Sequence, residues 1–362
     1  CRCRAAGGVR VKILFVTHRY PPRTGGVETH VREIATRLVE RGHEVTVFSA
    51  DAGSDVPSEE VVDGVRVRRF RSLSPDSAFY FAPQLSLAVR RATADVIHAH
   101  NYHAFPLLFA ALGVTDEQFV VTTHYHAGST SERRDILLSL YQTVGRWAVQ
   151  QADEVIAVSE WERDQLRSDF GVEATVIPNG VVVDRFAGAA AAQRDRPYLL
   201  TVGRLEEYKG VQHVIRAMTA LPEYDLLIAG SGSYRGQLEQ IARDEGVTAQ
   251  VEFLGYVDDE TLPGLYAGAD VYVTMSEFEA YGMTVAEALA AGTPCVVRNV
   301  AALQDWTQNR GVIGVSTVSP ESIRQAVRST DRTGNPMLKN RSWEAVTTRQ
   351  VQEVYMNEAS AR

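Results

Sequence analysis

The stretch VKILFVTHRYPPRTGGVETHVREIATRLVERGHEVTVFSA, residues 11–50, decides the fold. It begins with an apolar, β-branched run at 11–17, which is typical of a buried strand. After a Pro- and Gly-containing loop, apolar residues recur at helical spacing from Val27 to Val39, and Gly42 is the expected C-cap. A second strand follows at 44–50. Strand, helix and strand in this order predict a parallel sheet, because the crossover helix must cover one face.

The alternation of strand and helix continues along the chain in two series. Further strands of the first series are expected at 65–70, 95–100, 119–124 and 154–159. The second series places its strands at 197–204, 225–232, 250–255, 270–276 and 294–299. An α/β chain of two doubly wound, Rossmann-like parallel-sheet domains is therefore predicted. Ligands are expected in a cleft between the domains, at the carboxyl ends of the strands.

A small, polar and unpatterned stretch, 187–196, divides the two series. We interpret it as an interdomain linker, which gives a first domain at 11–186 and a second domain at 197–341. Residues 1–10 show no helix or strand pattern and are interpreted as a tail. A helical pattern returns in the last segment, 342–362.

Composition limits the classes of function. The chain has 362 residues, a formal net charge of −8, and 45% hydrophobic residues, which is typical of a globular protein with sizeable cores. The negative charge argues against nucleic-acid binding, which needs clustered Lys and Arg. Cys1 and Cys3 lie in the tail and Cys295 lies in an apolar run, so we expect a buried thiol and a reducing compartment. Without an apolar run of about 20 residues, a cytoplasmic protein is expected.

A first charged motif follows the first strand of the second domain. It reads GRLEEYKG, residues 203–210, and contains Arg204 and Lys209. Cations in this place stabilise the negative charge that accumulates on a departing phosphate group. Arg offers a planar fork and Lys a point charge. An ordinary surface pair is the alternative interpretation.

A second motif, SEFEAYGMTVAEALAAGTP at 276–294, passes from a strand into a helix. Glu279 is expected in the loop, and Glu287 one or two turns inside the helix. Backbone N–H groups at a helix N-terminus suit a diphosphate, and a nearby carboxylate can accept both hydroxyls of a ribose. For either glutamate alone, a capping or solvent-facing role is the alternative.

These motifs, in this order and over nearly the whole chain, resemble the family 4 glycosyltransferases. The resemblance implies the GT-B fold, retention of the anomeric configuration, and a nucleoside diphosphate sugar as donor. By resemblance, Arg204 and Lys209 bind the diphosphate. Glu287 holds the ribose, and Glu279 contacts the transferred sugar. The other donor contacts that it implies lie at Gly25, Gly26, Gly203, Tyr281, Gly282, Met283 and Thr284. It also implies that a helix in 342–362 crosses back to the first domain.

Five of the nine histidines lie close together in the first domain. His98 and His100 share one face of a strand, so a metal site is one interpretation. No Cys or carboxylate spacing completes a ligand set, and no metal-ligating residues are predicted. The resemblance instead places His124 beside the donor sugar as a catalytic residue. His100, Asn101 and Asn179 would shape the floor of the cleft.

The chain departs from the family pattern at three places. Val182 stands where the family often has Asp, Tyr281 replaces a common Phe, and 300–314 lacks the usual glycine-rich pattern. No D-x-D triplet ends a strand, so we expect no divalent ion at the diphosphate, and no cofactor besides the nucleotide-sugar co-substrate. For retention we favour a front-face displacement assisted by the leaving phosphate, because the resemblance supplies no nucleophile.

The acceptor is left open among carbohydrate, lipid-linked and small-molecule substrates. A row of arginines precedes an aromatic stretch in the first domain, at Arg66, Arg68, Arg69 and Arg71. Solvated arginines on an exposed edge strand are one interpretation. Contact with an anionic lipid at a membrane surface, or with a phosphorylated acceptor, is the other.

Two rival functions fit parts of the pattern. A NAD-dependent oxidoreductase would use the same strand–loop–helix start with Asp51 as ribose-binding acid, but the first turn reads GGVETH and not G-x-G-x-x-G. A catalytically silent GT-B module that only binds nucleotide sugar would share the whole fold. The presence of Arg204, Lys209 and both glutamates favours an enzyme.

Overall fold

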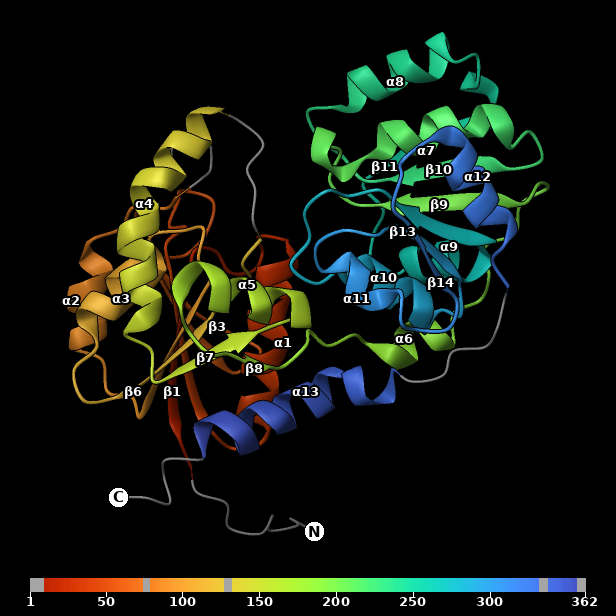
Figure 1. The fold of residues 1–362 in the computed structure, drawn as a ribbon. Helices are drawn as coiled ribbons and strands as arrows, with labels where there is room; N and C mark the ends of the chain where they lie inside the picture. The colour runs from red at the N-terminus through yellow and green to blue at the C-terminus, as the bar shows by residue number, and fades with distance from the viewer. Residues whose placement is uncertain (1–9, 74–78, 127–131, 332–337, 357–362) are drawn as a thin grey trace, which may run out of the picture.

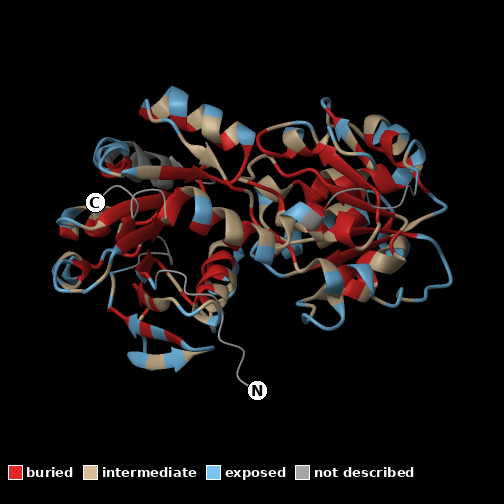
Figure 2. Ribbon diagram, turned by 90° about the horizontal axis from the view of Figure 1, so that it is seen from below, coloured by how far each residue is buried: buried red, intermediate tan, exposed pale blue. Residues whose placement is uncertain are grey.

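The computed structural model describes residues 10–73, 79–126, 132–331 and 338–356, which form two α/β domains side by side (Figure 1). The predicted tail, except Arg10, lies outside the described residues, as do Cys1 and Cys3. Buried strands occupy the centre of each domain, and partly exposed helices cover them (Figure 2). The two parallel-sheet domains predicted from the sequence are confirmed.

The first domain is built on an eight-stranded sheet with the order β3-β4-β2-β1-β5-β6-β7-β8. Its strands are β1 Lys12–Thr17, β2 Glu44–Ser49, β3 Glu59–Val62, β4 Val65–Arg69, β5 Val96–His100, β6 Gln118–Thr122, β7 Glu154–Ala157 and β8 Thr175–Val176. Only β3 is antiparallel to its neighbour. The helices are α1 Gly26–Glu40, α2 Gln84–Arg90, α3 Pro106–Gly113, α4 Glu132–Gln150 and α5 Glu160–Phe170. The central strands are buried on both faces, which explains their continuous apolar runs.

The second domain contains a wholly parallel six-stranded sheet with the order β11-β10-β9-β12-β13-β14. Its strands are β9 Tyr198–Val202, β10 Asp225–Ala229, β11 Val251–Gly255, β12 Val271–Thr274, β13 Cys295–Arg298 and β14 Val312–Val315. Its helices are α6 Val183–Ala187, α7 Val211–Ala217, α8 Arg235–Asp244, α9 Leu262–Gly268, α10 Met283–Ala290, α11 Leu303–Trp306 and α12 Pro320–Arg328. The sheet order reverses between β9 and β12, where open α/β sheets bind ligands. Cys295 is fully buried in β13, as expected.

The chain passes from the first domain to the second before α6. Ile177 packs in the first-domain core, and Val181 packs in the second-domain core. The stretch 187–196, which we expected to link the domains, lies against the second domain instead, because Ala192 N–H donates to the Gly264 carbonyl (2.9 Å). Helix α6, which leads into this stretch, packs on α9 and α10. The small, polar sequence of 187–196 gave no indication that it lies on the second domain.

The last helix returns to the first domain. Helix α13, Trp343–Gln350, continues into a π-helical turn at Val351–Tyr355. Its buried side chains share the first-domain core with β1 and α1, and Figure 1 shows α13 running beneath that domain. The outgoing and returning segments meet where Val181 N–H donates to the Arg341 carbonyl (2.8 Å). The two domains are therefore joined by a pair of adjacent backbone segments.

The arginine row does not form a free basic patch. β4 is the second strand of the sheet and not its edge, because β3 covers it. Arg66 pairs with Glu44, Arg68 with Glu59, and the fully buried Arg69 side chain pairs with Glu60 (2.5 Å). These carboxylates neutralise three of the four arginines, which weakens the prediction of an anionic contact. The exposed Arg71 lies beyond β4 and has no ion pair among the described residues. Among the described residues, no helix combines the length and apolar character needed to cross a membrane.

Packing of α13 on the crossing gives a first prediction. A Cβ at Gly180 would lie 2.4 Å from the Trp343 ring. Gly180→Ala should therefore lower the free energy of unfolding by about 1–3 kcal/mol, the usual cost of overpacking, measured by denaturant titration. Gly236→Ala in α8 is the control, since a Cβ there meets nothing within 4 Å. Equal stability of Gly180→Ala and wild type would contradict the packing described here.

Candidate active site

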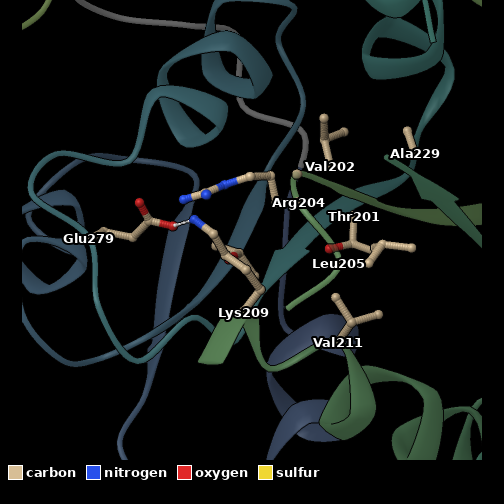
Figure 3. Close-up of a pocket in the computed structure, with 10 residues that line it drawn as sticks. Thr201, Val202, Arg204, Leu205, Lys209, Val211, Ala229 and Glu279 are labelled. Atoms are coloured by element: carbon tan, nitrogen blue, oxygen red, sulfur yellow. Dashed lines mark hydrogen bonds and ion pairs between the residues drawn. The ribbon is translucent and has the colours of Figure 1, made fainter. Parts of the chain in front are cut away.

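A pocket lies at the point where the second sheet reverses its strand order. Its lining includes Gly203 and Arg204 after β9, Lys209, Thr274 at the end of β12, and Glu279. Figure 3 shows the Arg204, Lys209 and Glu279 side chains pointing toward one another. Four residues predicted for the donor site, Gly203, Arg204, Lys209 and Glu279, are thus brought together here.

An ion pair joins the two motifs across this pocket. Lys209 Nζ lies 2.6 Å from Glu279 Oε1. Lys209 ends a short 3₁₀ turn, Glu207–Lys209, and the next residue, Gly210, has a φ of +71°. A Cβ at Gly210 would lie 2.2 Å from the Met275 carbonyl oxygen. Glycine is therefore required for the turn after β9 to approach the end of β12.

Charge in the pocket is predominantly positive. Burial lowers the pKa of Lys209, whereas the Glu279 carboxylate raises it. The net shift is upward, so Lys209 stays protonated at neutral pH. The exposed Arg204 guanidinium donates to the Tyr208 hydroxyl (3.0 Å). Within the described part of the chain Arg204 makes no recorded ion pair. One carboxylate thus faces two cations, and the pocket can take a further anion.

Glu287 lies apart from this pocket, on α10. Its Oε2 accepts a hydrogen bond from the Tyr266 hydroxyl (2.9 Å). Desolvation raises the pKa of Glu287 to about 7, although the Tyr266 bond lowers it. Glu287 does not line the pocket that holds Lys209. A ligand that reaches both residues must therefore extend along the start of α10.

Residues at the start of α10 differ in how they are engaged. The Tyr281 carbonyl accepts from the Trp306 indole (2.5 Å), and the two rings lie 5.2 Å apart. Thr284 Oγ1 accepts from the Tyr272 hydroxyl (2.7 Å). Gly282 is the N-cap with a φ of +91°, and Met283 packs against the cores of both domains. The side chains of Tyr281 and Thr284 are therefore engaged within the protein, where they support the loop at the start of α10.

The Gly25–Gly26 loop of the first domain holds a carboxylate that the sequence analysis missed. A Cβ at Gly25 would lie 2.3 Å from Glu28 Oε2. Burial raises the pKa of Glu28, but hydrogen bonding and charge from His18 and the charge of Arg19 lower it to about 2. Arg19 Nη2 lies 2.5 Å from Glu28 Oε1. Arg19 therefore neutralises a carboxylate that is itself only 2% exposed.

The cleft residues predicted near the first sheet lie at its strand ends. Asn101, with a φ of +73°, pairs its side-chain amide with His18 (3.2 Å). Asn179 accepts from His30 Nδ1 (2.7 Å). His100 and His124 are stacked with ring centroids 5.8 Å apart. Burial lowers the pKa of both imidazoles well below the usual value, so both are neutral.

Glu162 is a second residue that the sequence analysis missed. Its buried carboxylate accepts from Thr123 Oγ1 (2.5 Å), Tyr125 N (2.5 Å) and Val158 N (2.6 Å). The first two donors flank His124, whose φ is +46°. Glu162 therefore fixes the turn that presents His124. The Ser159-x-x-Glu162 spacing signals a helix start, but no local pattern reveals the contact with the turn after β6.

Comparison with known proteins gives the class. A model for Glycosyltransferase Family 4 matches residues 24–185, and one for glycosyl transferases group 1 matches 184–332. A glycosyltransferase of Methanocaldococcus jannaschii is 31% identical over 354 residues, 88% of each chain. The glycogen synthase of Mycobacterium tuberculosis is 32% identical over 360 residues, 88% of this chain and 86% of that one. These matches show that the chain is a glycosyltransferase.

Solved structures agree on the architecture. The sucrose-phosphate synthase of Thermosynechococcus elongatus superposes with a TM-score of 0.81 at 22% identity, over 98% of this chain and 100% of that one. This likeness shows the GT-B fold. The chain belongs to the family 4 glycosyltransferases.

The raised pKa of Glu287 generates a second prediction. Only the ionised carboxylate can accept both ribose hydroxyls, so donor affinity should be constant above pH 7 and fall below it, by up to tenfold per pH unit. The measurement is calorimetric titration with a nucleotide sugar between pH 5.5 and 8. Glu287→Gln should bind more weakly and lose this dependence. A wild-type profile that is flat from pH 8 down to pH 5.5 would contradict the ribose role.

Proposed function

We propose that this glycosyltransferase transfers a hexose from a nucleoside diphosphate sugar with retention of configuration, and that protein groups neutralise the diphosphate without a divalent ion. The convergence of Arg204, Lys209 and Glu279 supports the proposal. The base and the sugar are to be identified with a donor panel scored by thermal shift, because a saturating donor stabilises the folded state.

We expect the diphosphate to bind at the ion pair formed by Lys209. Glu279 Oε1 lies 2.6 Å from Lys209 Nζ and balances its charge. A diphosphate brings greater negative charge to the same ammonium and to Arg204, and it displaces the carboxylate. Glu279 is then available to accept a hydroxyl of the transferred sugar. As the glycosidic bond breaks, both cations stabilise the growing charge on the leaving group.

Retention follows from a front-face displacement. The acceptor hydroxyl attacks the anomeric carbon on the side from which the diphosphate departs. The electron pair of the broken C–O bond goes to a phosphate oxygen, and this oxygen takes the hydroxyl proton. The neutral imidazole of His124 hydrogen-bonds the sugar without adding charge, and Glu162 positions it.

The acceptor is a carbohydrate or another polyhydroxylated molecule. The balanced charges of the first-domain loop, where Glu28 pairs with Arg19, support this, because they suit an uncharged acceptor. The similar glycogen synthase carries a name that implies a glycan acceptor. The paired arginines of β4 offer no comparable support for an anionic lipid.

Of the rival functions, the oxidoreductase has the weaker support. Asp51 accepts from the Ser49 hydroxyl (2.6 Å) and from Tyr20 N (3.3 Å), so its carboxylate is engaged inside the fold and not free for a ribose. A nicotinamide fluorescence titration should show no binding. For the silent module, donor hydrolysis by the purified protein discriminates, since a sensor leaves the donor intact.

Lys209 provides a third prediction. Lys209→Ala should lower kcat/KM by about 10²-fold or more, with a substantial part in kcat, because the lost cation acts on charge that develops in the transition state. Affinity for the nucleoside diphosphate product should fall as well. Steady-state kinetics is the measurement, and Lys12→Ala, at the exposed start of β1, is the control. Normal kcat and product affinity in Lys209→Ala would remove this residue from the mechanism.

Independence from hard divalent ions is the fourth prediction. Transfer should persist after dialysis against EDTA, because Arg204 and Lys209 supply the positive charge that a metal would otherwise bring to the diphosphate. The measurement is the initial rate with and without added Mg²⁺ or Mn²⁺. Complete loss of transfer that either ion restores would show that the diphosphate needs a metal.

A further inference from the structure

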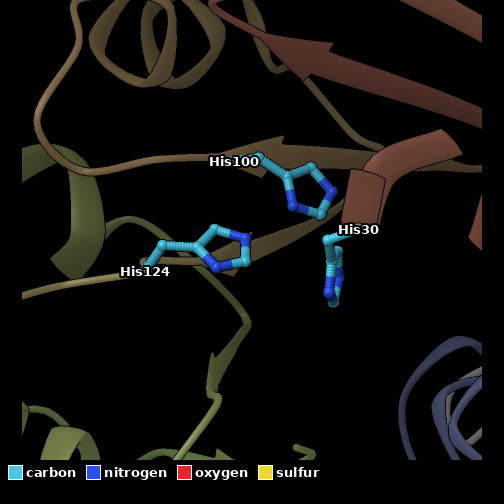
Figure 4. A group of neighbouring side chains, drawn as sticks. All are labelled: His30, His100 and His124. Atoms are coloured by element: carbon cyan, nitrogen blue, oxygen red, sulfur yellow. The ribbon is translucent and has the colours of Figure 1, made fainter. Parts of the chain in front are cut away.

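Three imidazoles from different elements meet inside the first domain. His30 comes from α1, His100 from the end of β5, and His124 from the turn after β6 (Figure 4). The ring nitrogens that they offer lie within 4.8 Å of one another. Exposure is 2% for His30, 0% for His100 and 7% for His124. The cluster is thus shielded from solvent, with His124 as its most accessible member.

Several of these ring nitrogens lack a partner. Among the described residues, both nitrogens of His100, Nε2 of His30 and Nε2 of His124 make no hydrogen bond. A buried polar group left unsatisfied costs about 1–3 kcal/mol, and such groups are rare unless an ion or water completes them. Because three neighbouring imidazoles all have ring nitrogens without a hydrogen-bond partner, they indicate a ligand that all three can bind.

The tautomer of His30 fits metal coordination. Its Nδ1 lies 2.7 Å from Asn179 Oδ1, and a carbonyl oxygen only accepts, so Nδ1 carries the proton and Nε2 presents a lone pair. Histidines that bind metals are oriented in this way by a hydrogen bond from the other ring nitrogen.

We propose that His30, His100 and His124 form a binding site for a divalent transition-metal ion such as Zn²⁺. Imidazole suits Zn²⁺, Cu²⁺, Ni²⁺ and Co²⁺, whereas Mg²⁺ and Ca²⁺ take oxygen ligands, and the cluster contains no carboxylate. With Zn–N bonds of about 2.0–2.1 Å, the rings must close inward by side-chain rotation. Three histidines leave a fourth position for water or a hydroxyl group.

This site lies apart from the diphosphate pocket, but it shares His124 with the sugar contact proposed above, and a metal on Nε2 leaves the Nδ1–H group to donate to the sugar. Its ligands lie in the first domain, whereas Arg204 and Lys209 lie in the second. Metal binding can therefore be tested without reference to sugar transfer, and its failure would leave the proposed function intact. His30 and Asn179 also link α1 to the interdomain crossing, so a bound ion would stiffen the junction of the two domains.

The test is direct metal titration of the full chain after removal of metals with a chelator. Wild type should bind one equivalent of Co²⁺, followed by visible absorption, and Zn²⁺ should displace it and raise the Tm. The Trp343 ring lies 5.5 Å from His30, so Cu²⁺ should quench part of the tryptophan fluorescence, and Trp343→Phe should lose that part.

Variants distinguish metal binding at this site from metal binding by other residues of the chain. Asn179→Ala should weaken Co²⁺ binding by roughly 10- to 100-fold, and His30→Ala or His100→Ala by more. His213→Ala, in α7 of the second domain, should bind as wild type does. The double change Cys1→Ser and Cys3→Ser should also leave binding unchanged. A wild-type chain that binds no Co²⁺ or Zn²⁺, or one whose binding survives His30→Ala and His100→Ala, would overturn the proposal.

Discussion

The ion pair between Lys209 and Glu279 depends on the way parallel sheets are wound. β9 and β12 are adjacent in space although about 70 residues separate them along the chain. Because the strands are parallel, the turns that follow them meet at one edge of the sheet. Gly210 lets the first turn approach the second without a clash. The anion pocket is thus a consequence of strand order and one glycine.

The first domain repeats this arrangement with different chemistry. Its sheet reverses order between β1 and β5, and the segments that follow these strands carry Glu28, in α1, and Asn101. Where the second domain gathers cations, this one pairs a carboxylate with Arg19 and gathers neutral imidazoles. Such a division suits a donor that carries a diphosphate and an acceptor that carries hydroxyl groups. The crossing at Gly180 and Trp343 joins the two halves.

Periodicity predicted the sheets well because buried parallel strands are continuous apolar runs, as β1 and β5 show. It missed β3, β8 and β14, which are short and only partly buried. It also misplaced the linker, because the bond between Ala192 and Gly264 is a long-range contact. Arg204, Lys209 and Glu279 were found because they belong to motifs that follow strands and that resemble the family pattern. Glu28, Glu162 and His30 were missed, since their partners come from other elements and sequence spacing carries no trace of them.

The central claim is that a diphosphate takes the place of Glu279 at Lys209. Calorimetric titration with a nucleoside diphosphate, identified by the donor panel, tests it in wild type and in Glu279→Gln. The account predicts that the variant binds the nucleoside diphosphate at least as tightly as wild type, because a competing carboxylate is gone, while sugar transfer falls. Weaker binding by the variant, with folding intact by thermal melt, would contradict the account.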